Sequence, residues 1–134
     1  MANIAANNQK LMLDWNLGAT SGPASVTRPA TVAVGLSLGA PTSVSMSEIG
    51  TASGYSVQTV SFSSASSPAG STLNINAMTF GPFSSAQSIS GVILKDTVST
   101  GGGFLWFGTL TTARTVAIGD SLVIAASALV VTLS

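Results

Sequence analysis

The chain has 134 residues, of which only 6% carry formal charge, and the four basic and four acidic side chains cancel to a net charge of zero. This length suits one domain with a single core. Soluble domains are usually about a quarter charged, so Ser and Thr must supply most of the polar surface here. Such a surface repels copies of itself weakly, and we therefore expect association with a partner.

The composition excludes several classes of function. The sequence contains neither Cys nor His, on which zinc, copper and haem sites, disulfides and Ser-His-Asp triads depend. Four scattered basic residues do not form the basic patch that binds nucleic acid. No apolar run reaches the roughly 18 residues that span a membrane. We expect no enzyme activity, no cofactor, no metal, no nucleic acid and no membrane partner.

Residues 2–17 hold most of the helix-forming residues and predict one N-terminal α-helix that ends at Gly18. On a helical wheel the apolar residues fall on two sides instead of one stripe. Either the helix is fully buried in its own domain, or it is held between that domain and a partner. The second interpretation yields candidate interface residues, with Trp15 as the anchor: Ile4, Leu11, Met12, Leu13, Trp15 and Leu17.

Residues 18–31 are rich in Gly, Pro, Ser and Thr and predict an extended arm. The chain therefore divides into an N-terminal helix and arm, residues 1–31, and a β-sandwich domain, residues 32–134. The first residues, MANIAANNQK, lack the basic and then apolar order of a signal peptide. We accordingly expect synthesis in the cytoplasm.

From Val32 onward, alternating or β-forming residues predict strands over 32–38, 55–62, 73–80, 88–95 and 104–110. The apolar phase changes within 73–80, which commonly marks a bulge or a strand that moves between sheets. Residues 104–107 are apolar on both faces and predict a central strand. A turn at 111–113, a short strand, a turn at Gly119-Asp120 and one long strand over 121–134 follow. The predicted fold is mainly β, a jelly-roll-like β-sandwich with one N-terminal α-helix and an extended arm.

The charged residues of the strands and loops have structural interpretations. Lys95 and Asp96 are neighbours at a strand end and point to opposite faces, so a solvated strand end is expected. Asp120 is expected to bond local backbone amides in its turn. Residues 101–103 are three glycines followed by a strand, which predicts a hairpin tip, because a phosphate loop is followed by a helix. The aromatic side chains of the strands are expected in the core.

Residues 91–134 contain an ordered set of motifs. They comprise an apolar strand, an acidic residue, a Gly-Gly loop, an aromatic strand ending in Gly-x-Leu-Thr-Thr, and Val-x-x-Gly-Asp before an alternating strand. With KLMLDWNLGAT, VAVGLSLGAPT, Glu48, GYSVQTVSF and INAMTFGPF upstream, this order resembles a family of small tailed-phage structural proteins. These are capsid cement (decoration) proteins, whose relatives often carry a tail fibre label. The family often has an Arg shortly after Gly-Tyr, where this chain has Ser56-Val57-Gln58.

The resemblance implies a jelly-roll-like domain on the outer surface of the phage head, with no catalytic residues. It implies a structural virion protein that binds the major capsid protein and stabilises the capsid. Together with the neutral composition, it predicts a homodimer or homotrimer. One alternative is a tail- or fibre-associated phage protein. An alternative of another class is a carbohydrate-binding β-sandwich module, which would expose aromatic side chains on one face.

Overall fold

The computed structural model describes residues 3–4, 31–65, 70–98 and 103–132. Among these residues it contains nine strands and one short 3-10 helix, η1 (Thr51–Ser53). The strands are β1 (Asn3–Ile4), β2 (Ala33–Ser37), β3 (Gln58–Thr59), β4 (Ser71–Leu73), β5 (Met78–Phe80), β6 (Gln87–Lys95), β7 (Phe104–Val116), β8 (Leu122–Ile124) and β9 (Val130–Thr132).

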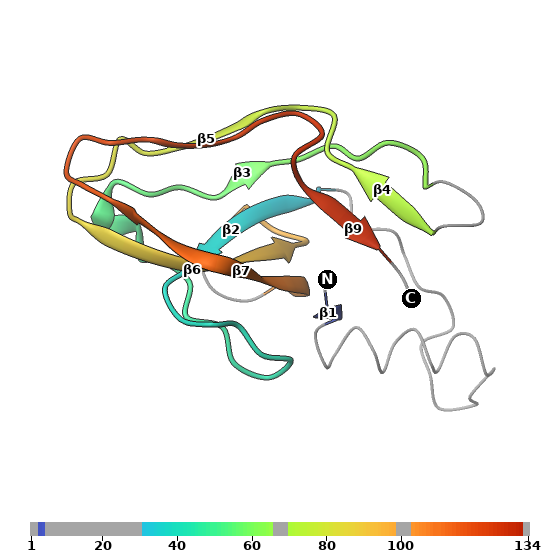
Figure 1. The fold of residues 1–134 in the computed structure, drawn as a ribbon, viewed down its shortest axis with the longest axis horizontal. Coiled ribbons are helices and arrows are strands. Elements are labelled where there is room, and N and C mark those ends of the chain that lie inside the picture. The colour runs from blue at the N-terminus through green and yellow to red at the C-terminus, as the bar shows by residue number, and fades with distance from the viewer. Residues whose placement is uncertain (1–2, 5–30, 66–69, 99–102, 133–134) are drawn as a thin grey trace.

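The strands form two layers (Figure 1). One layer is a five-stranded antiparallel sheet in the order β1-β7-β6-β2-β3, and the other holds two separate two-stranded sheets, β4-β9 and β5-β8. The apolar core lies between them and includes Leu36 of β2, Phe80 of β5, Ile89 of β6 and Val131 of β9. The predicted mainly β fold is confirmed. The described sheets do not close on one another, so they do not form a complete jelly roll.

β2 lies within the strand predicted over residues 32–38, but all five of its residues are buried, so both of its faces are covered. Val34 and Leu36 have no exposed surface and pair with Leu94 and Val92 of β6. Leu38 lies within the predicted strand but is 40% exposed. The reason is that β2 ends at Ser37, after which the chain turns away from the sheet.

The long hairpin predicted over 88–110 is formed by β6 and β7. Its loop begins with the Asp96 N–H donating to the Gly103 carbonyl, 2.9 Å away, and Gly103 has a φ of 65°. Residues 99–102, at the predicted glycine tip, lie outside the described residues. The central position predicted for 104–107 is confirmed at Trp106 and Phe107, which pair with β6 on one side and β1 on the other.

Two predicted local structures are wrong. Residues 111–113 do not turn, because β7 continues through them to Val116. The single strand predicted over 121–134 is two strands, β8 and β9, separated by a turn in which Ser127 takes the left-handed φ of 64°. The two strands have different partners, since β8 pairs with β5 and β9 pairs with β4. The change of apolar phase within residues 73–80 was predicted correctly as a passage between sheets, because β4 and β5 belong to different two-stranded sheets.

The predicted N-terminal helix is not supported. Asn3 and Ile4 form β1 and pair with Phe107 and Trp106. Pairing with a sheet edge satisfies backbone groups and overrides the modest helix propensity of a short segment. Residues 5–17 and the arm over 18–30 lie outside the described residues. The division at residue 31 stays a prediction.

Most of the aromatic residues lie in the core, as predicted. Tyr55, Phe80 and Phe83 are at most 2% exposed. The rings of Tyr55 and Phe80 stack with their centroids 6.1 Å apart. Phe107 is buried, whereas Phe104 and Trp106, near the beginning of β7, are only partly buried.

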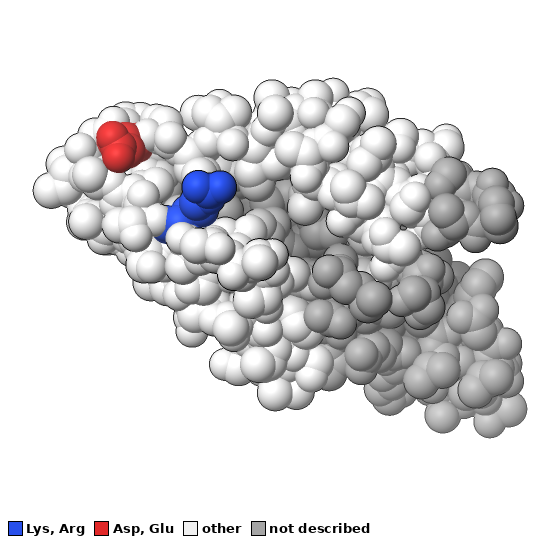
Figure 2. All heavy atoms as spheres, viewed as in Figure 1, with Lys and Arg blue, Asp and Glu red and all other residues white. Residues whose placement is uncertain are grey.

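The surface has little charge. Figure 2 shows a face on which Lys, Arg, Asp and Glu occupy only small areas among uncharged atoms. Across the described ranges, no helix has both the length and the apolar character that a membrane crossing requires.

Candidate interaction surface

Among the described residues, the outer edge of β7 is paired only over a short stretch. β6 pairs along one side of β7, but β1 covers only Trp106 and Phe107 on the other side. Within the part of the chain that the structure describes, no strand pairs with the outer edge of residues 108–116. An open edge presents unpaired N–H and C=O groups to solvent and is a site for strand addition.

A bulge distorts β7 beside this open edge. The register passes from Gly91–Thr109 to Ile89–Arg114, so that residues 110–113 oppose only Ser90. Thr111 and Thr112 in the bulge are exposed. Bulges bend and twist a strand, and they limit uncontrolled pairing at sheet edges. The flat part of the open edge is therefore short and begins next to β1.

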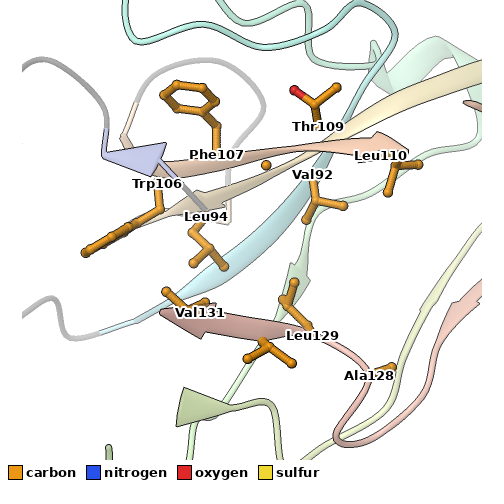
Figure 3. Close-up of a pocket in the computed structure, with 11 residues that line it drawn as sticks. Val92, Leu94, Trp106, Phe107, Thr109, Leu110, Ala128, Leu129 and Val131 are labelled. Atoms are coloured by element: carbon orange, nitrogen blue, oxygen red, sulfur yellow. The ribbon is translucent and has the colours of Figure 1, made fainter. Parts of the chain in front are cut away.

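An apolar groove of about 300 Å³ lies between β7 and the second layer. Val92 and Leu94 of β6, Trp106 and Leu110 of β7, and Leu129 and Val131 line its two walls (Figure 3). The side chains of Phe107 and Thr109 project from the other side of β7 in the same view. Val130 also lines the groove and is 50% exposed. The groove and the outer edge of residues 108–116 are together called the open side.

Asn74 holds in place the wall of the groove that Leu129 and Val131 form. Its side chain has no exposed surface. Its side-chain amide donates to the Ala125 carbonyl, and its Oδ1 accepts from the Leu129 N–H, at 2.9 and 2.8 Å. Its backbone also bonds Ser127 and Leu129. These bonds fix the turn between β8 and β9, which places Leu129 and Val131 opposite β7.

A second cluster combines polar and charged groups in the interior. Lys95 Nζ lies 2.7 Å from Glu48 Oε2, and the two side chains are 0% and 5% exposed. The Tyr55 hydroxyl donates to Glu48 Oε1 at 3.1 Å and accepts from the Leu36 N–H at 2.9 Å. Burial, followed by the nearby Glu48 charge, raises the pKa of Tyr55, although the Leu36 hydrogen bond opposes the shift.

This cluster corrects the solvated strand end predicted for Lys95. Lys95 is buried because residues from three separate segments meet on one side of β2. Gly35 permits this approach, since a Cβ there would lie 2.7 Å from Glu48 Oε1 and 2.9 Å from the Tyr55 hydroxyl. This deeply buried charge pair joins β6 to the Glu48 loop. We interpret it as structural.

The turn role predicted for Asp120 is confirmed, because Asp120 Oδ2 accepts from the Ala117 N–H at 3.0 Å. Of the predicted interface residues, only Ile4 lies in a described element, where its backbone pairs with Trp106. The other predicted interface residues lie outside the described residues: Leu11, Met12, Leu13, Trp15 and Leu17. Sequence reasoning missed the open side, which depends on the relative positions of β7 and β9.

A family model matches nearly the whole chain. A model of the family described as "podophage GP4 fiber I protein gp80" matches residues 3–132. The chain belongs to this family. It is a bacteriophage structural protein, and its family places it in the virion. A search of curated proteins found no match.

The family match confirms the resemblance to tailed-phage structural proteins at that general level. It names a fibre protein, so it supports the predicted alternative, a tail- or fibre-associated protein, better than the capsid cement protein of the main prediction. The description of the family names a structural protein and mentions no catalytic activity.

Proposed function

We propose that the protein is a structural subunit of a phage fibre and that it assembles with other copies of itself through the open side. The observation that carries this proposal is an apolar groove beside an uncovered strand edge, in a member of a fibre protein family. Apolar patches of this kind on soluble proteins mark interaction sites. The predicted capsid location is the competing proposal.

The physical argument favours neutral packing over ion pairs. Exposed ion pairs contribute about 0–1 kcal/mol each and weaken with salt, and Arg114 is the charged residue on the exposed part of β7. Each Å² of apolar surface that a partner covers contributes about 25 cal/mol before ordering costs, and salt does not screen this contribution. A homodimer or homotrimer built on the groove is therefore expected to persist at high salt.

The assembly surface can be tested with two matched variants. Leu129→Asp places a carboxylate in the groove, whereas Leu122→Asp places one on β8, at a leucine that is likewise partly buried against the core. We expect sedimentation to show oligomers for the unmodified protein and for Leu122→Asp, and monomers for Leu129→Asp. Equal behaviour of the two variants would show that the groove is not the interface.

The location is tested on intact virions. Antibody raised against the purified protein, bound to gold and imaged on phage particles, should label the fibres at the tail. Label distributed over the head would support the capsid proposal and contradict ours. The N-terminal interface residues, Trp15 foremost, remain candidates for the contact that attaches the subunit to the virion.

A further inference from the structure

The short strand β1 occupies part of the open side of its own domain. Asn3 pairs with Phe107 and Ile4 with Trp106, in antiparallel register. Trp106 therefore has two roles, since its backbone receives β1 while its side chain lines the groove. Any copy of the protein that covers the groove must lie next to the place where β1 pairs. The strand site and the proposed assembly site are continuous.

The chain between β1 and the rest of the domain is long enough to serve either the same copy or a neighbour. Residues 5–30 separate β1 from the next described residue. At about 3.4 Å per residue, a segment of this length can span at most roughly 90 Å. A compact domain of this size has a radius of gyration of about 14 Å. The covalent connection thus does not restrict β1 to its own β7.

We propose that β1 of one copy pairs with β7 of a second copy, so that the subunits of the assembly exchange their N-terminal strands. This inference rests on the proposed self-association. The hydrogen bonds between β1 and β7 are the same whether one copy or two supply the strands, so exchange loses none of them. Packing over the adjacent groove is gained only between copies. In addition, neighbours in an assembly are present at a high effective concentration.

A disulfide placed across β1 and β7 distinguishes the two arrangements. Directly opposed residues of antiparallel strands have Cα atoms about 4.5–5.5 Å apart, within the range of a disulfide. The chain has no cysteine of its own, so an introduced pair can form only the intended bond or random ones. Ile4→Cys and Trp106→Cys introduce thiols at opposed positions.

The two substitutions are placed in separate chains, one of which carries a small solubility tag. The chains are unfolded together, refolded as a mixture, oxidised mildly and resolved on a denaturing non-reducing gel. Exchange predicts that the mixed-size dimer is the main cross-linked product, exceeding either dimer of like chains by several fold. Each single variant refolded and oxidised alone measures the random background. A mixed dimer no more abundant than this background overturns the exchange.

A second set of variants avoids altering Trp106. Prolines at both positions of β1, Asn3→Pro with Ile4→Pro, remove the N–H groups that β1 can donate to β7. We expect these prolines to convert the oligomer to monomer in sedimentation, while Asn3→Thr with Ile4→Val leaves it intact. An oligomer that survives the prolines refutes strand exchange but leaves the groove interface standing. An unmodified protein that sediments as a monomer refutes the proposed self-association itself.

Discussion

The buried pair of Lys95 and Glu48 permits a quantitative prediction. Replacing Lys95 by Met keeps most of the side-chain volume but leaves the Glu48 carboxylate without its ammonium partner, in a site where it is 5% exposed. Removal of one member of a buried pair typically costs about 3–5 kcal/mol, because a charge stays buried without compensation. Natural domains have total stabilities of about 5–15 kcal/mol. We therefore expect Lys95→Met to lower the melting temperature by roughly 10–20 °C.

The assay is thermal and urea unfolding followed by tryptophan fluorescence, with three further variants, of which the first is Glu48→Leu alone. The double variant Lys95→Met with Glu48→Leu removes both charges, and we expect it to recover at least half of the lost stability, since an apolar replacement of a buried pair is often nearly neutral. Arg114→Met removes a positive charge from an exposed position and should change the free energy of unfolding by less than about 0.5 kcal/mol.

Two results would refute this reasoning. If Lys95→Met costs no more than Arg114→Met, the ammonium group is not buried against Glu48. If the double variant loses the sum of the two single losses, the two groups do not interact. Added salt should change the loss only slightly, because buried pairs are screened much less than exposed ones.

Four other measurements follow from the same structure. The pKa of Tyr55 is raised in the folded state, while the unfolded chain has the ordinary pKa of about 10. The contribution of Tyr55 to the free energy of unfolding should therefore be fully present below about pH 10 and fall as the pH rises above it. Tyr55→Phe should remove this part of the pH dependence. Because Tyr55 is the single tyrosine, tyrosinate absorbance should rise only as the protein unfolds. Asn74→Ala leaves the Leu129 N–H without its side-chain acceptor and should cost at least about 2 kcal/mol in urea unfolding. Self-association should show the same sedimentation profile at low and high salt.

Local patterns predicted the parts of the fold that depend on neighbours in sequence. The β6–β7 hairpin was predictable because both strands are apolar and a glycine-rich loop separates them. The Asp120 turn was predictable because Gly119 and Asp120 favour a tight turn and its side-chain bond closes locally. The phase change within residues 73–80 correctly indicated a strand that passes between sheets.

The remaining features depend on residues far apart in the chain. Lys95 is buried because its partner lies 47 residues earlier in the sequence, a distance over which periodicity carries no information. The division between β8 and β9 depends on Asn74, which follows β4 and bonds Ala125 and Leu129 from more than 50 residues earlier in the chain. The strand at Asn3–Ile4 forms only because the edge of β7 is available to it. The open side could not be predicted from the sequence either, because it depends on how β7 and β9 lie relative to each other.

The central claim is that this protein is a fibre subunit whose open side is covered by another copy. The most direct measurement is a cryo-EM reconstruction of the whole phage particle, at a resolution that traces the chain. We predict density for the domain in a fibre at the tail, with the groove between Leu110 and Val131 filled by a neighbouring copy. Density for the domain on the capsid surface, or a groove open to solvent in the fibre, would contradict the account.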